Sequence, residues 1–199
     1  MIIISDPQFI PNEVAIINAL FEAGLEVLHL RKPEADALEM SELVSQIDSR
    51  FHSRIMIHSH YEFLNSFNLK GIHFTEKTKN KQDKFANVAC KKSMAVHELS
   101  DLNKIKSFID YVFLSPLFPS VSKEGYSKQW DYNELRTEIA KNRDFKVVAL
   151  GGITLENIHK ISALGFDDFA ILGSIWEPAK AGYSTEQVID IYRQFNHEK

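Results

Sequence analysis

Residues 146–174, KVVALGGITLENIHKISALGFDDFAILGS, carry a pattern from which the fold class can be predicted. Two apolar runs of strand length, Lys146–Leu150 and Phe169–Leu172, lie at its two sides. The segment between them, Leu155–Leu164, has helical spacing, and Thr154 is placed to cap its first turn. The two runs show little internal alternation, which is typical of strands buried on both faces. The stretch therefore predicts a strand–helix–strand unit of a parallel sheet.

The same alternation extends along the rest of the chain. Six further apolar runs have strand length: Met1–Ser5, Glu26–Leu30, Arg54–Ile57, Gly71–Phe74, Lys92–Val96 and Tyr111–Leu114. Six further segments have helical spacing: Asn12–Ala23, Ala37–Phe51, Tyr61–Phe67, Glu98–Phe108, Asn133–Lys141 and Thr185–Phe195. The polar stretch Thr75–Lys84 predicts a solvated loop where a helix would otherwise stand.

Eight strands alternating with about seven helices fit either a closed (β/α)8 barrel or an open doubly wound sheet. The count of eight favours the barrel, although 199 residues are few beside the roughly 250 of a typical one. No G-x-G-x-x-G follows the first strand, which weakens a dinucleotide-binding interpretation. No repeat or linker divides the sequence. We therefore predict an α/β fold, a compact (β/α)8 TIM barrel forming a single domain over residues 1–199.

Composition excludes several classes of function. The chain has 23 basic and 27 acidic side chains, a formal net charge of −4, which argues against nucleic-acid binding. No apolar run approaches the roughly 20 residues of a membrane helix, and the N-terminus lacks the basic region of a signal peptide. The single cysteine, Cys90, cannot form an intramolecular disulfide. We expect a cytoplasmic protein that binds neither nucleic acid nor membrane; homo-oligomer formation is left open.

Five of the eight histidines fall near the C-terminal ends of predicted strands: His29, His58, His60, His73 and His97. Barrel enzymes carry their chemistry at these ends, so we expect at least one to act as an acid or base. Taken singly, each is more often a packed core residue. The pair His58-x-His60 has the spacing of some zinc-binding barrel hydrolases, but no carboxylate that would complete such a site is evident. We therefore predict no metal.

Four residues after the last two strands predict a phosphate site. Gly151 and Gly152 follow the seventh strand, and Gly173 and Ser174 follow the eighth. Glycine allows the backbone N–H groups to approach an anion closely, and barrels often bind phosphate at this corner. The competing interpretation is that these are ordinary turn glycines.

Two further features have weaker anion-binding signals. Ser120, Ser122 and Lys123 offer two hydroxyls and an ammonium group on one loop, which suits a phosphate or diphosphate but also suits a solvated loop. Arg31 ends a buried strand, where its permanent charge needs an anionic partner, either a carboxylate of the protein or the substrate.

The order of these motifs resembles the thiamine phosphate synthase/TenI family over essentially the whole chain. The segments that carry the resemblance are VLHLRK (27–32), IMIHSH (55–60), KGIHF (70–74), AVHEL (95–99), DYVFLSPLFPSVSK (110–123), VVALGGIT (147–154) and GFDDFAILGSIW (165–176). The family fold is a compact (β/α)8 barrel. The resemblance implies that Arg31 faces a diphosphate and that Gly152, Gly173 and Ser174 hold a thiazole phosphate. Segment 120–123 matches a T-x-T-K loop, with serine in place of threonine.

The sequence departs from the synthase pattern at the expected magnesium ligands. His58-Ser59 replaces an Asn-Asp pair, and Thr78 or its neighbours stand where a further aspartate is expected. Magnesium prefers oxygen ligands and usually takes a carboxylate. His29 stands in place of a synthase glutamine, as in the TenI-like branch, and His97 matches that branch's acid–base residue. TenI-like proteins are similar to thiazole tautomerases.

We therefore predict a thiazole tautomerase with His97 as acid–base, His29 as a second catalytic residue, and His58 and His73 as further pocket residues. A small thiazole phosphate is its expected partner, and no cofactor is expected. The alternative is a thiamine phosphate synthase, which would need magnesium. A third hypothesis, from another class, is a non-catalytic regulator that binds a phosphorylated ligand.

Overall fold

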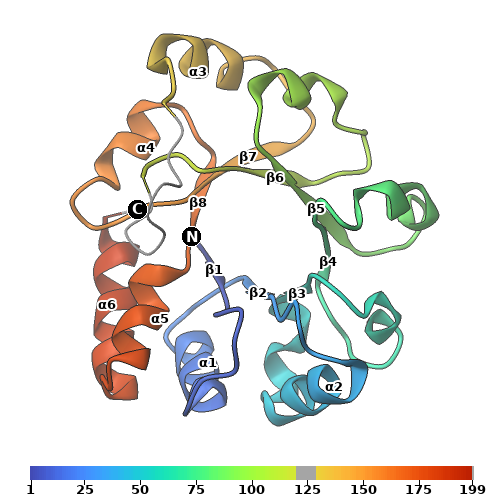
Figure 1. Cartoon of the computed structure of the whole chain (residues 1–199), viewed down its shortest axis with the longest axis vertical. Helices are drawn as coiled ribbons and strands as arrows, with labels where there is room; N and C mark the ends of the chain where they lie inside the picture. Colours follow the sequence, from blue (N-terminus) through green and yellow to red (C-terminus); the bar gives the residue numbers. More distant parts are fainter. Residues whose placement is uncertain (120–128, 199) are drawn as a thin grey trace.

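The computed structural model describes residues 1–119 and 129–198. Eight parallel strands pair in chain order, and β8 pairs with β1, so the sheet closes into the ring seen in Figure 1. The predicted barrel is thus confirmed and the open sheet is wrong. The strands are β1 (Ile2–Ile4), β2 (Leu28–Leu30), β3 (Ile55–Ile57), β4 (Gly71–Phe74), β5 (Lys91–Val96), β6 (Tyr111–Leu114), β7 (Lys146–Leu150) and β8 (Asp168–Ile171).

Helices surround the strands (Figure 1). They are α1 (Glu13–Glu22), α2 (Ala37–Gln46), α3 (Tyr132–Ile139), α4 (His159–Ala163), α5 (Gly173–Lys180) and α6 (Thr185–His197). Short 3₁₀ helices span Ser49–Arg54, Tyr61–Leu64, Lys79–Phe85 and Leu99–Lys104. The crossovers from β3 to β6 carry 3₁₀ turns instead of full α-helices, which explains how so short a chain closes a barrel. Within the described ranges, no helix combines the length and the apolar character needed to span a membrane.

Several predicted helices have different bounds in the structure. The helix expected over Ala37–Phe51 ends at Gln46, and the Asp48 carboxylate caps a separate 3₁₀ turn by accepting from the Arg50 N–H. Thr154 is not a helix N-cap, because α4 begins only at His159. The helix α5 was not predicted at all, because it starts with a glycine and contains Pro178. The polar stretch after β4 includes a 3₁₀ helix as well as loop.

The strands separate two apolar layers. Along β2, Leu28 and Leu30 belong to the layer between barrel and helices, whereas His29 points into the barrel. The interior layer contains the residues Ile2, Ile4, Met56, Tyr111, Phe113, Val148 and Ala170. Branched aliphatic side chains fill most barrels of this type. Here histidines share the space with them, since the ring centroids of His29 and His73 lie 4.8 and 5.2 Å from that of Phe113.

A buried ammonium group organises the loop between β1 and α1. Lys32 is 1% exposed, and its Nζ donates to both carboxylate oxygens of Glu13 at 2.6 and 2.8 Å. It also donates to the carbonyl oxygens of Asp6 (2.9 Å) and Gln8 (2.6 Å), and lies 4.9 Å from the centre of the Phe9 ring. A buried charge is tolerated when it is paired and hydrogen-bonded in this way. The loop is therefore folded around Lys32.

The last strand–helix unit is tied to the first strand. Trp176 of α5 is fully buried, and its Nε1–H donates to the carbonyl oxygen of Ile4 at 2.7 Å. α5 also packs on α6, which in turn packs on α1. These contacts fasten the barrel where β8 meets β1.

Candidate functional site

A chain of polar side chains crosses the barrel interior. Nδ1 of His29 on β2 lies 2.9 Å from Nε2 of His58, which directly follows β3. The other nitrogen of His29, Nε2, is 2.6 Å from the hydroxyl of Tyr111 on β6. Nδ1 of His73 on β4 lies 2.9 Å from Oγ of Ser93 on β5. Sequence reasoning found the three histidines but missed Tyr111 and Ser93, which it treated only as strand residues.

Burial keeps these imidazoles neutral. His29, His58 and His73 are 0%, 7% and 3% exposed. Desolvation lowers the pKa of all three, to about 3 for His73. The positive charge of Arg31 lowers the pKa of His58 and His73 further. His29 and His73 therefore sit inside the barrel, within strands, rather than at its rim.

His97 occupies a different position, at the C-terminal end of β5. It is half-buried, and its Nδ1 lies 2.9 Å from the carbonyl oxygen of Ser115, which follows β6. A carbonyl oxygen only accepts hydrogen bonds, so Nδ1 carries the proton. In the neutral ring the lone pair is then on Nε2, which makes Nε2 the basic atom.

His60 does not join His58. Its Nε2 donates to the Ala35 carbonyl at 3.1 Å, and its Nδ1 lies 3.5 Å from the Glu62 carboxylate. The H-x-H spacing therefore does not bring the two rings into one site.

The structure brings together the loops expected to hold phosphate. Ser174 Oγ donates to the Ile153 carbonyl at 2.8 Å, which joins the start of α5 to the loop after β7. Gly173 and Ser174 form the first turn of α5, where backbone N–H groups lack intrahelical acceptors. The N-terminal end of a helix also carries partial positive charge. This corner has the donors that an anion needs.

Gly151 and Gly152 also have a structural reason to be glycine. Both have positive φ, 102° and 64°. A Cβ on Gly152 would lie 2.3 Å from the carbonyl oxygen of Pro119, and one on Gly151 would lie 2.9 Å from Cα of Pro116. Segment 116–119 thus packs directly against the two glycines. Both were predicted as phosphate ligands, and their close packing supplies a second explanation.

Four predicted anion ligands remain: Arg31, Ser120, Ser122 and Lys123. Arg31 is half-buried, its backbone N–H donates to Ser5 Oγ at 2.8 Å, and its guanidinium forms no ion pair within residues 1–119 or 129–198. A substrate anion stays the predicted partner for it. Ser120, Ser122 and Lys123 lie outside the described residues.

The residues that the structure describes do not fit magnesium. In the described ranges, the one group of three potential metal ligands is the set of buried histidines, which contains no carboxylate. Thr78, near the place expected for an aspartate, has its Oγ1 3.0 Å from the Tyr61 hydroxyl. Asp6, near the end of β1, pairs with Lys180 at 3.0 Å. Because magnesium prefers an oxygen shell with a carboxylate, no step is assigned to it.

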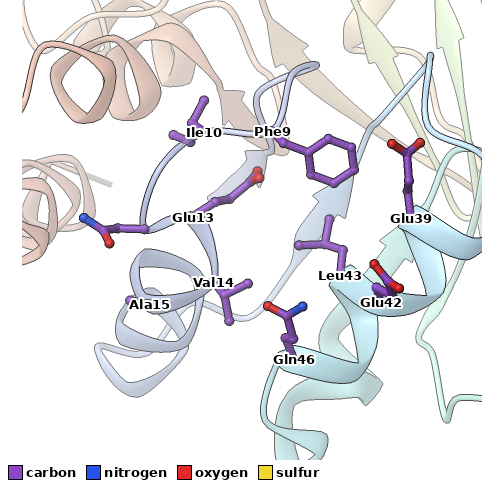
Figure 2. A pocket seen from close by; sticks show the side chains of 10 residues that line it. Phe9, Ile10, Glu13, Val14, Ala15, Glu39, Glu42, Leu43 and Gln46 are labelled. Carbon is purple, nitrogen blue, oxygen red and sulfur yellow. The ribbon is translucent and has the colours of Figure 1, made fainter.

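A cavity of about 450 Å³ lies outside the barrel, between α1 and α2 (Figure 2). It contains none of the predicted site residues; its lining is Phe9, Ile10, Asn12, Glu13, Val14, Ala15, Glu39, Glu42, Leu43 and Gln46. Two of its carboxylates are already used, since Glu13 pairs with Lys32 and Glu39 accepts from the Asp36 N–H. We assign it no chemistry.

Comparison with known proteins agrees with the geometry. The family model described as thiamine monophosphate synthase, TMP-TENI, matches residues 1–175. A thiamine-phosphate synthase of Klebsiella pneumoniae is 24% identical over 184 residues, covering 89% of this chain and 87% of that protein. The crystal structure of a thiamine phosphate pyrophosphorylase from Bacteroides thetaiotaomicron is 33% identical with a TM-score of 0.84, covering 100% and 96% of the two chains. The chain therefore belongs to the thiamine phosphate synthase/TenI family.

Proposed function

We propose that this family member is a thiazole tautomerase of the TenI type, an isomerase acting on a phosphorylated thiazole carboxylate. The observation that carries the proposal is the bond from His97 Nδ1–H to the Ser115 carbonyl, which makes Nε2 the basic nitrogen at the barrel mouth. A neutral imidazole oriented by a second group is suited to move a proton near neutral pH.

Each part of the substrate has a counterpart in the chain. The phosphate would accept hydrogen bonds from the backbone N–H groups of Gly173 and Ser174 at the start of α5. Arg31 would pair with the carboxylate. His97 Nε2 would remove a proton from the non-aromatic ring system and return a proton at another position, so the ring becomes aromatic with no change in composition. The reaction needs no redox partner and no leaving group.

A second candidate is thiamine phosphate synthase, because the relatives named above carry that name or its synonym. The synthase reaction joins a pyrimidine diphosphate to the thiazole phosphate, and the S-x-S-K segment would suit the diphosphate. The missing carboxylates weigh against it, since magnesium would have to be held by other groups. A non-catalytic regulator would bind the thiazole phosphate without either reaction.

One experiment separates the three candidates. Purified protein is incubated with the non-aromatic carboxythiazole phosphate, and aromatisation is followed by proton NMR. In parallel it is incubated with the aromatic thiazole phosphate, the pyrimidine diphosphate and magnesium. We expect aromatisation at a rate unaffected by magnesium. Magnesium-dependent coupling without aromatisation would establish the synthase, and tight binding with neither reaction would establish the regulator.

A further inference from the structure

The geometry points to a transition-metal site inside the barrel: we propose that His29, His58 and His73 together bind one divalent ion of the zinc type. The three imidazoles come from β2, the end of β3 and β4, so no short sequence motif joins them. This inference does not rest on the proposed function, because metal binding can be measured without any substrate.

The positions of the three rings suit a common ligand. One nitrogen of each imidazole can be chosen so that all three lie within 4.8 Å of one another. The facing nitrogens of His29 and His58 are 2.9 Å apart, and the rings of His58 and His73 lie 4.2 Å apart, centroid to centroid. Two facing imidazole nitrogens at this distance need a proton or a cation between or beside them, since two lone pairs would repel.

The surrounding groups are those that orient metal-binding histidines. Such histidines use their second nitrogen as a donor to a neighbouring oxygen. His29 Nε2 has the hydroxyl of Tyr111 at 2.6 Å, and His73 Nδ1 has Ser93 Oγ at 2.9 Å. If both nitrogens donate, Nδ1 of His29 and Nε2 of His73 carry the lone pairs that a metal requires.

A second and independent observation concerns His58. Its Nδ1 is buried and has no hydrogen-bond partner among the described residues. A buried ring nitrogen without a hydrogen-bond partner destabilises the fold. If Nε2, which faces His29, binds the ion, Nδ1 of His58 carries the proton of the ring and lacks an acceptor among the described residues. An anion that binds beside the ion would supply that acceptor.

The donor set selects the class of metal. Three imidazoles without a carboxylate suit Zn²⁺, Co²⁺ or Ni²⁺, whereas Mg²⁺ and Ca²⁺ require oxygen. Three protein ligands leave at least one coordination position open. The charge of Arg31 acts on both His58 and His73. An ion in this place would therefore favour an anion, such as a carboxylate or phosphate group, as its remaining ligand.

The test uses untagged protein stripped with a chelator and titrated with Co²⁺, Zn²⁺ and, separately, Mg²⁺. We expect one Co²⁺ per chain, visible absorption bands typical of four-coordinate Co²⁺, displacement by Zn²⁺ and no response to Mg²⁺. Absence of stoichiometric Co²⁺ and Zn²⁺ binding would overturn the proposal.

Variants then identify the ligands. His29→Gln keeps a donor for Tyr111 but removes the facing Nδ1, and His58→Asn removes Nε2. Each should weaken binding by more than the roughly 10–100-fold that a lost outer-shell partner costs. His159→Asn, at an exposed position on α4, is the matched control and should bind normally. Unchanged affinity in a folded His29→Gln protein would refute the assignment.

A measurement on the unaltered protein covers the case in which the variants do not fold. Bound Co²⁺ shifts the exchangeable N–H protons of its imidazole ligands far outside the normal proton NMR range. Three such resonances are expected, from His29, His58 and His73. None would mean that Co²⁺ binds elsewhere.

Discussion

The bond from His97 to the Ser115 carbonyl allows a sharp substitution. Asparagine at position 97 can still donate to that carbonyl through its amide, but it has nothing at the place of Nε2. A positioned acid–base typically contributes about 10²–10⁴-fold to a rate. We therefore expect His97→Asn to slow tautomerisation by that factor, as measured by the initial rate of aromatisation.

The matched control for this prediction is His159→Asn on exposed α4, which should keep the full rate. Phosphate affinity should stay nearly unchanged in both proteins, because the proposed phosphate site is at the start of α5. A His97→Asn protein with the normal melting temperature and normal turnover would remove His97 from the mechanism.

The buried imidazoles predict a dependence of stability on pH in the metal-free protein. Their folded-state pKa values lie below the unfolded value of about 6.5, so on acidification the unfolded chain takes up protons first. The contribution of the neutral imidazoles to the free energy of unfolding is therefore present above about pH 6.5 and is lost as the pH falls further. Because the folded-state pKa of His73 is about 3, this residue alone should lower the free energy of unfolding by about 2 kcal/mol between pH 7 and pH 5.

Urea unfolding of chelator-treated protein at the two pH values measures this loss. His73→Asn keeps a donor for Ser93 but cannot titrate, so its stability should fall less over the same interval. Equal losses in the two proteins would show that His73 is protonated alike in the folded and unfolded chains.

For single residues, the sequence predicts positions along the strands but not the contacts between side chains. The positions of Gly173, Ser174 and His97 at strand ends followed from counting apolar runs, because each parallel strand delivers its next residue to the same rim. The bonds joining His29 to Tyr111 and His73 to Ser93 could not be predicted. They depend on which side chains of neighbouring strands point inward at the same height, and the stagger of a barrel decides that.

Two glycines in neighbouring elements differ in whether they tolerate a side chain: Gly152 in the loop after β7 does not, whereas Gly173 at the start of α5 does. A Cβ on Gly152 would overlap the Pro119 carbonyl at 2.3 Å, and φ is positive there. Gly152→Ala should therefore cost about 2–4 kcal/mol in unfolding free energy. Gly173→Ala is the control: its Cβ would meet only Glu177 Cγ at 3.8 Å, and alanine favours helix.

Chemical denaturation of both variants tests this contrast. Gly173→Ala should stay within about 1 kcal/mol of the parent, or gain slightly. If Gly152→Ala were as stable as Gly173→Ala, segment 116–119 could not be packed against the loop as described.

The errors in predicting elements have one physical origin. The helix α5 was missed because Gly173 and Pro178 are poor helix formers: Gly173 stands at the helix start, and Pro178, in the last turn, has no backbone N–H to donate. Its stability comes from burying Ile175 and Trp176 instead. Conversely, the strong helical spacing of Ala37–Phe51 did not prevent a break after Gln46, where Asp48 caps a new turn. Local spacing predicts the order of elements better than their ends.

The hydrogen bond from Trp176 to Ile4 of β1 can be removed to test what holds the barrel closed between β8 and β1. Trp176→Phe retains an aromatic ring but leaves the Ile4 carbonyl without its donor. A buried group left unsatisfied costs about 1–3 kcal/mol. We expect a loss of that size in urea unfolding, with one cooperative transition. Tyr183→Phe, at an exposed site, should change nothing measurable.

If Trp176→Phe produced two separate transitions, the barrel would unfold in parts, and α5 would hold one part to the other. An unchanged midpoint would mean that the bond to Ile4 contributes nothing to closure.

The packing around Lys32 has a consequence for covalent labelling. Amine-reactive acylating reagents modify lysines that solvent can reach, and the Nζ of Lys32 is enclosed by Glu13 and two carbonyl oxygens. Brief labelling followed by peptide mass spectrometry should leave Lys32 unmodified while exposed lysines such as Lys104 react. Modification of Lys32 requires the β1–α1 loop to open. The acylation rate of Lys32 therefore measures how often that loop opens.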